Sequence, residues 1–226
     1  MGPDVLYENN YFKAFQVPGR GEMVVIEFKP CSSDASPTRH PSRTGRRMEP
    51  DGTVNYYERA DDHTYTHWKK RLGQLLTKHV VLPEVRRMGD RRALSIDKSI
   101  ILNFPEGYEL YNHRKGDRHD PRRDAYLIGS RHVNRFRSPQ EFFLHAKWLM
   151  EGQPLDREGF RACSCCYCNR SGVSQGDIAR QYGLGHVSES GARSRRPRQS
   201  RRVNQTPSAI AIQAKDYTRL HTSSTT

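Results

Sequence analysis

Four cysteines within six positions are the residues of this chain best suited to chemistry. They form a C-x-C-C-x-C pattern at Cys163, Cys165, Cys166 and Cys168. The two-residue gap between Cys165 and Cys168 lets two thiolates bind one tetrahedral zinc ion, and Cys163 can be a third ligand. A distant residue such as His145 or Cys31 would complete the four. Because no second pair with this gap is present, reduced thiols at a domain edge remain the alternative.

A second group of residues is suited to binding double-stranded DNA. Arg114 lies in a predicted mobile loop, and Arg137 directly precedes a predicted helix. If the two converge, each guanidinium can bind O6 and N7 of a guanine in the major groove. Asp124 could hold a guanidinium flat, and the helix start at Ser138 could donate backbone N–H groups to a phosphate. The alternative is a plain hairpin in which Arg137 pairs with a surface acid. The other basic side chains expected on phosphates are Lys115, Arg118, Arg122, Arg123 and Arg135.

The composition excludes several classes of protein. The chain has 226 residues, 34% of them hydrophobic, with a net charge of +13 and a mean hydropathy of −0.91. No apolar run approaches the roughly 20 residues of a membrane helix, and the first residues lack the segments of a secretory signal. Crowded cysteines cannot crosslink distant segments, so we expect an intracellular protein with reduced thiols. Because no familiar catalytic motif is present, we predict a protein that is not an enzyme, with no small-molecule substrate and no membrane contact.

Much of the positive charge lies near the C-terminus. Residues 186–206 carry six arginines against the single acid Glu189 and show no apolar period. With the polar composition beyond Asn169, this predicts a disordered basic tail over 169–226, with one helical turn at 178–182 as the exception. A nuclear import signal, a nonspecific tether to DNA or RNA and a solvated tail without a specific role all fit it.

An α+β fold is predicted, with a small β-hairpin or sheet packed on helices. Strands are expected at 21–28 and 53–57, joined by a flexible loop over 31–52. Apolar residues at three- and four-residue spacing predict a helix that starts near Thr64 or Thr66, and Leu82-Pro83 should end or redirect it. An extended segment follows over 93–102.

The strongest local signal is a helix start. Ser138 and Glu141 form a capping box around Pro139, and the helix should bury a stripe containing Phe142. Before it, a polar loop over 112–123, a strand at 124–128 and a short return at 135–137 are expected to form a hairpin.

Several of these motifs resemble a methyl-CpG-binding domain. They are P-E-G-Y at 105–108, D-A-Y at 124–126 and F-R-S at 136–138. The resemblance implies that Arg137 and Arg114 are the two base-reading arginines, and that Asp124 and Tyr126 help to recognise a methylated cytosine. Two departures stand out. Tyr108 replaces the family's tryptophan, and the hairpin turn is one residue longer and lacks N-P-x-G.

A wider string, over roughly residues 60–170, resembles the N-terminal silencing region of the fungal cryptic loci regulator proteins. It runs from Trp68-x3-Leu72-Gly73 through F-R-S-P-Q-E-F-F-L-H-A-K-W-L to Cys163-x-Cys165-x2-Cys168. The resemblance implies a nuclear, DNA-binding subunit of a heterochromatic repressor complex that contains a histone deacetylase and a nucleosome remodeller. Larger members continue into a further chromatin-associated domain, so we expect a truncated member or an incorrectly predicted gene.

Three regions are therefore expected along the chain. They are a β-rich region at 1–60, a silencing-factor core at 61–168 and the tail at 169–226; the core holds the methyl-CpG-binding-like unit at 104–150 and the cysteine cluster at 163–168. The alternative function is a protein-interaction module of a repressor complex that does not read DNA.

Overall fold

The structure is a computed structural model, and it describes residues 2–17, 22–42, 44–46 and 48–184. The basic tail predicted from the sequence lies largely outside the described residues. The described part belongs to one compact unit that ends at His186.

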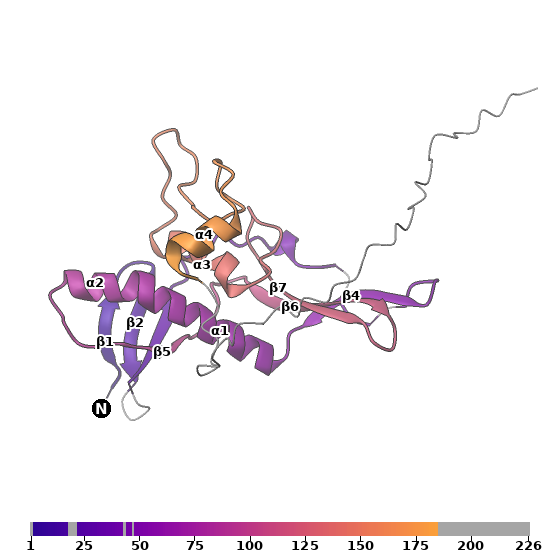
Figure 1. The fold of residues 1–226 in the computed structure, drawn as a ribbon, viewed down its shortest axis with the longest axis horizontal. Helices are drawn as coiled ribbons and strands as arrows, with labels where there is room; N and C mark the ends of the chain where they lie inside the picture. Colours follow the sequence, from indigo (N-terminus) through magenta and orange to yellow (C-terminus); the bar gives the residue numbers. More distant parts are fainter. Residues whose placement is uncertain (1, 18–21, 43, 47, 185–226) are drawn as a thin grey trace, which may run out of the picture. The chain divides into compact units, whose positions relative to one another are not determined.

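A four-stranded sheet forms the N-terminal side of this unit (Figure 1). Its order is β1-β2-β3-β5, with bounds Asp4–Glu8, Phe12–Val17, Met23–Phe28 and Ser95–Ile101. The first three strands are antiparallel neighbours, whereas β3 and β5 run parallel. A parallel pair needs a long crossover, and helix α1 lies within it. The strands predicted near 21–28 and 93–102 are confirmed as β3 and β5.

Helix α1, Asp62–Leu76, packs against β5 and also against helix α3, Pro139–Met150. Asp61 caps α1 by accepting a hydrogen bond from the Thr64 amide at 2.8 Å. Gly73 brings the helix close to the strand, because a Cβ there would lie 2.4 Å from Cα of Ile100. Leu82-Pro83 is predicted to end or redirect this helix, but the helical run does not end there. It continues through a π-helical turn η2, Thr77–Val81, into α2, Leu82–Arg87.

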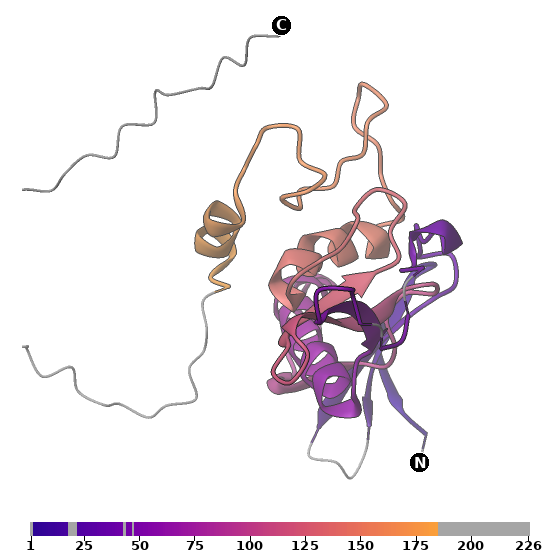
Figure 2. The same cartoon turned by 90° about the vertical axis from the view of Figure 1, so that its right-hand side faces the viewer.

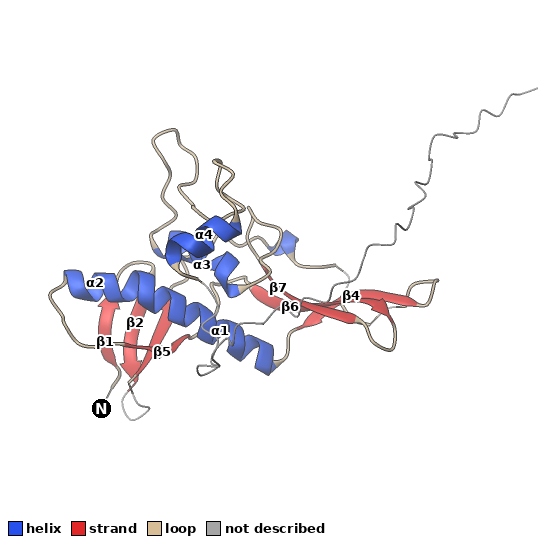
Figure 3. Ribbon diagram, in the orientation of Figure 1, coloured by secondary structure: helices blue, strands red, loops and turns tan. Residues whose placement is uncertain are grey.

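A second sheet has the order β4-β6-β7 (Figure 3). Its strands are antiparallel and span Thr53–Arg59, Glu109–Asp117 and Arg122–Ile128. The predicted polar loop over 112–123 is therefore wrong, since only residues 118–121 connect the two strands. The C-terminal half of β6 consists mainly of polar and charged residues, so the sequence lacks the alternation of apolar and polar residues that predicts a strand. The short return segment expected at 135–137 pairs with β7 through an antiparallel bridge between Leu127 and Phe136.

Helix α3 begins at the predicted residue, but only the Ser138 half of the predicted capping box forms, because the Glu141 carboxylate accepts from the amide that precedes the N-cap residue. The Ser138 hydroxyl accepts from the Glu141 amide at 3.2 Å, and the Glu141 carboxylate accepts from the Arg137 amide at 2.8 Å. The helix is buried almost all round, and Figure 2 shows it beside α1. Phe142, the residue expected at the core, has no exposed surface. One polar side chain is equally buried in this apolar helix, His145.

The segment expected to begin a flexible loop at residue 31 is packed into the core. Ser32 and Asp34 have no exposed surface, and the short 3-10 turn η1 follows at Pro37–Arg39. Gly107 permits this packing, because it has φ of +76° and a Cβ there would lie 2.6 Å from Cβ of Ala35. Residues 1–60 also share both sheets with later strands, so they are not a separate region of the fold.

The chain beyond Asn169 forms one more helix within the described residues. Helix α4, Gln175–Tyr182, has a complete capping box at Ser174 and ends at Gly183. Disorder from residue 169 is therefore wrong up to residue 184, where Ile178 and Leu184 are buried. The predicted α+β class is confirmed. No described helix has the length and apolar character needed to cross a membrane.

Candidate metal centre and basic sheet face

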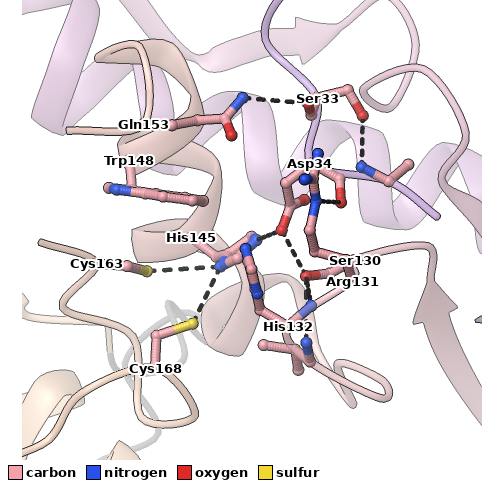
Figure 4. Close-up of polar contacts among 12 residues, drawn as sticks. Ser33, Asp34, Ser130, Arg131, His132, His145, Trp148, Gln153, Cys163 and Cys168 are labelled. Carbon is pink, nitrogen blue, oxygen red and sulfur yellow. Dashed lines mark hydrogen bonds and ion pairs between the residues drawn. The ribbon is translucent and has the colours of Figure 1, made fainter. Parts of the chain in front are cut away.

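Four buried side chains lie close together between α3 and the cysteine segment, and Figure 4 shows three of them, His145, Cys163 and Cys168. The four are His145, Cys163, Cys165 and Cys168, and their ligand atoms all lie within 4.8 Å of one another. The imidazole Nδ1 is 3.5, 3.9 and 3.6 Å from the sulfurs of Cys163, Cys165 and Cys168 respectively. A group of three thiols and one imidazole at this spacing has the composition of a tetrahedral metal site.

Local structure explains why these side chains converge. His145 lies on α3, two turns after its cap, on a helix whose orientation the apolar core sets. A tight turn brings Cys165 and Cys168 together, because the amides of Cys168 and Asn169 both donate to the Cys165 carbonyl, at 3.1 and 2.9 Å. The two-residue gap recognised in the sequence is thus a turn that directs two sulfurs the same way.

The remaining cysteines lie outside the cluster. Cys31, one of the two candidates for the fourth ligand, is exposed and donates to the Asn10 carbonyl at 2.8 Å. Cys166 is half-buried, and burial raises the pKa of its thiol to about 11, so it stays protonated at neutral pH. Of the two candidates that the sequence left open, His145 is the residue in the cluster.

Hydrogen bonds within the cluster shift the pKa values of its side chains. Hydrogen bonds to Cys165 and Cys168, together with burial, raise the pKa of Cys163, whereas hydrogen bonds from Cys163 and Cys165 lower the pKa of Cys168. Burial alone would lower the pKa of His145, but hydrogen bonds to Asp34, Cys165 and Cys168 outweigh it and raise the pKa well above its usual value. A metal ion that binds here must therefore displace protons from the ligands.

A carboxylate, a phenol and a hydroxyl lie behind the imidazole. Asp34 Oδ2 is 3.3 Å from His145 Nε2 and accepts from the Ser130 hydroxyl at 2.7 Å (Figure 4). The Tyr108 hydroxyl donates to Asp34 Oδ1 and lies 3.2 Å from the same Nε2. Burial would raise the pKa of Asp34, but His145, Tyr108 and Ser130 lower it to about 2. None of these three residues is predicted from the sequence to belong to the site, and the only local signal is the hydroxyl of Tyr108 where the resembled family has tryptophan.

The residues predicted to bind DNA are divided between the two faces of the β4-β6-β7 sheet. Alternate residues of a strand point to opposite faces, and the register pairs Lys115 with Arg122 and His113 with Asp124. Lys115, Arg122, Asp124 and Tyr126 therefore share one face, which also carries Tyr57, His113 and Tyr111. We call this the basic-aromatic face.

The basic-aromatic face has an ordered arrangement of rings and cations. Tyr57 and His113 stack with centroids 4.4 Å apart. Arg135 lies 4.5 Å above the ring of Tyr126 and donates to the Tyr57 hydroxyl at 3.3 Å. Burial and the charges of the nearby Arg135 and Lys115 lower the pKa of His113.

One guanidinium on this face is held by an acid. Asp124 accepts from Nε and Nη2 of Arg122, at 2.9 and 3.0 Å, while the Arg122 side chain stays 78% exposed. The arrangement proposed for Asp124, an acid that holds a guanidinium flat, is thus formed with Arg122 rather than with Arg114 or Arg137.

Arg114 and Arg123 lie on the opposite face. Arg114 is on β6, not in a mobile loop, and its Nε is 2.7 Å from a carboxylate oxygen of Glu58. Arg123 pairs with Asp61 at the cap of α1. Arg137 is exposed directly before the start of α3 at Ser138, and Arg118 is exposed in the turn between β6 and β7. The structure therefore does not bring Arg114 to the face that Arg122 occupies.

The fold and the site define a class: an α+β protein with a buried Cys3His cluster and a basic-aromatic sheet face. The family model described as transcription-silencing protein, cryptic loci regulator Clr2, matches residues 100–168. The resemblance to this family is confirmed over that range, which contains β6, β7, α3 and all four cluster residues. The methyl-CpG-binding-like unit stays a prediction.

One solved structure, "Structure of Clr2 bound to the Clr1 C-terminus", is similar at 21% identity with a TM-score of 0.39. The match covers 67% of this chain and 31% of that one, so it spans less than a third of the longer protein. No curated protein matches the sequence.

Proposed function

We propose that this chain is a nuclear, non-catalytic subunit of a heterochromatic silencing complex, and that it binds double-stranded DNA through the basic-aromatic face. The observation that carries the proposal is the family match over residues 100–168, because this range holds both β6-β7 and the metal cluster. We further propose that its partners include the histone deacetylase and remodeller subunits of such a complex.

The metal of the cluster is zinc under this proposal. A zinc ion about 2.0 Å from nitrogen and about 2.3 Å from sulfur, in tetrahedral geometry, separates the nitrogen from each sulfur by roughly 3.5 Å. The three Nδ1–sulfur distances of 3.5, 3.9 and 3.6 Å lie close to this value. Four protein ligands leave no open position, so the zinc would be structural and would hold the cysteine segment on α3.

Adjacent cysteines provide a matched test of the zinc site. Cys165→Ser removes a ligand, whereas Cys166→Ser makes the same change at a half-buried thiol outside the cluster. We expect one zinc per chain in the native protein and in Cys166→Ser, measured by mass spectrometry of the metal, and loss of zinc in Cys165→Ser. A native protein purified without metal, and unable to take up zinc, would contradict the site.

For DNA binding, the basic-aromatic face offers exposed cations beside stacked rings. Lys115, Arg122 and Arg135 would contact phosphates, and Arg137 would reach a base edge from the start of α3. The amides at that start can also bind a phosphate. Because Arg114 and Arg123 lie on the other face, a duplex docked on the basic-aromatic face does not contact them together with Arg122.

Two neighbouring arginines test the face directly. Arg122→Gln and Arg123→Gln change the charge equally at residues that face opposite sides of the sheet. In fluorescence anisotropy with one duplex at several salt concentrations, Arg122→Gln should weaken binding and reduce the salt slope by about 1. Arg123→Gln should leave the slope unchanged, with folding checked by thermal unfolding because its partner Asp61 caps α1.

The opposite result, in which only Arg123→Gln reduces the slope, would refute the choice of face. If the full chain shows no salt-dependent binding to DNA, the protein-interaction alternative replaces the DNA proposal.

If the chain binds DNA, duplexes with and without a symmetrically methylated CpG measure whether Arg137 reads bases. In that case Arg137→Ala should weaken binding by about 1–3 kcal/mol on the preferred duplex.

A further inference from the structure

Asp34 lies outside the cluster, and its carboxylate directly contacts the imidazole of the cluster. It lies in the loop after β3, more than a hundred residues before His145 in the sequence, and it has no exposed surface. A buried carboxylate is costly unless charge-assisted hydrogen bonds satisfy it. Its oxygens face His145, Ser130 and Tyr108, so its hydrogen-bonding capacity is used at the back of the cluster.

The orientation of the His145 ring shows how these contacts can act on the cluster. The imidazole directs Nδ1 to the three sulfurs and Nε2 to Asp34. When Nδ1 binds a metal ion, the ring proton must be on Nε2, and a metal-binding histidine usually donates that proton to a carboxylate or carbonyl. Asp34 Oδ2 at 3.3 Å is such an acceptor. The hydroxyl of Tyr108 donates its own proton to Asp34, and its oxygen at 3.2 Å from Nε2 can share the role.

Asp34 is held in place by backbone contacts on both sides. The amide of Arg131 donates to the Asp34 carbonyl at 3.0 Å, and the amide of Ser36 donates to the Gly129 carbonyl at 2.8 Å. Beside it, Ser33 donates through its hydroxyl to the Glu106 carbonyl at 2.6 Å. The carboxylate therefore faces His145 as part of a fixed segment and not as a mobile side chain.

We propose that Asp34 is the positioning residue of the metal centre: it fixes the His145 ring with Nδ1 toward the metal and raises the affinity of the site. This inference rests on the proposed zinc site. Asp34 also connects the segment after β7 to the centre, because the same carboxylate accepts from the Ser130 hydroxyl. The Ser130 oxygen in turn accepts from the amides of His132 and Val133 at 3.0 and 3.2 Å.

The test compares Asp34→Asn with Ser33→Ala in the full chain. Asp34→Asn keeps the size of the side chain but removes the charge, whereas Ser33→Ala removes two other hydrogen bonds of the same segment, the one donated to the Glu106 carbonyl and the one accepted from the Ala35 amide. Competition against a chromophoric chelator should show zinc affinity lowered about 10- to 100-fold in Asp34→Asn and unchanged in Ser33→Ala. Cobalt in place of zinc should keep the thiolate charge-transfer bands in both, because the three sulfurs remain.

The outcomes separate the two proposals. A native protein that binds no zinc refutes the metal site itself. A native protein that binds zinc, with Asp34→Asn of equal affinity, overturns the role of Asp34 alone, and so does an equal loss in Ser33→Ala. If Asp34→Asn does not fold, Tyr108→Phe decides, because it removes the hydroxyl that donates to Asp34 and lies 3.2 Å from His145 Nε2. A lowered affinity supports positioning of the ring by the Asp34–Tyr108 pair, and an unchanged affinity overturns it.

Discussion

The close contact between α1 and β5 at Gly73 yields the sharpest prediction for stability. A Cβ at this position would lie 2.4 Å from Cα of Ile100 and 2.6 Å from its backbone N and C. These are main-chain atoms of strand β5, so the clash in Gly73→Ala cannot be relieved by rotating a side chain. The helix must move away from β5. Because α3 packs on α1 and carries His145, the shift would also reach the metal cluster.

The expected cost follows from two opposing effects. Overpacking a core costs about 1–3 kcal/mol, and a clash with main-chain atoms puts this cost at about 3 kcal/mol. Alanine gains at most about 1 kcal/mol over glycine in a helix. The net loss of about 2 kcal/mol should lower the melting temperature by roughly 4–8 °C for a domain of this size. Thermal unfolding followed by circular dichroism measures it.

Helix α4 provides the control for Gly73→Ala. A Cβ at Gly176 would have only the Ser174 hydroxyl near it, at 3.6 Å. Gly176→Ala should therefore leave the melting temperature unchanged or raise it. A Gly73→Ala protein as stable as the native one would refute the reasoning, since it would mean that α1 and β5 are not in backbone contact.

Three further predictions concern caps and the metal. Ser138→Ala should destabilise the protein by about 1 kcal/mol in denaturant unfolding, because the Glu141 amide loses its acceptor; no change would mean that another group satisfies that amide. Removing metal with a chelator should lower the melting temperature, by less at acidic pH because protons compete for the ligands; an equal temperature at neutral pH contradicts a structural metal. The pKa of Asp61 is lowered to about 2, chiefly by its hydrogen bond from the Thr64 amide. Its stabilisation is therefore complete above about pH 4 and lost as the pH falls through about 2, and Asp61→Asn should remove that part of the pH dependence of unfolding.

Signals confined to a few neighbouring residues predicted structure well. The serine cap predicted at Ser138 fixes the start of α3 to the residue, because its hydrogen bond connects groups three positions apart, although the Glu141 carboxylate accepts from the Arg137 amide and not from that of Ser138. The gap between Cys165 and Cys168 likewise predicts a turn that the backbone forms. In these cases the information needed for the structure lies in the local sequence.

Long-range contacts explain what the sequence did not reveal. The second half of β6 is strongly polar, so it is a strand because β4 and β7 pair with it on both sides, and not because of its own pattern. Asp34 sits in a stretch of serine, proline and charge that is typical of a loop. Only the fold brings it to His145, 111 positions later, and no spacing rule connects the two.

The cysteine segment also supports the turn that carries Arg137. Tyr167, between two cysteines, donates to the Glu141 carboxylate at 2.6 Å, and the same oxygen accepts from the Arg137 amide. Phe136 packs between the rings of His145 and Tyr167, with centroids 5.1 and 5.7 Å away. The backbone before and at Arg137 is therefore fixed by groups that belong to the metal cluster or directly adjoin it. Under the proposed zinc site, removal of the metal should therefore weaken the hydrogen bond between Tyr167 and Glu141 beside the start of α3.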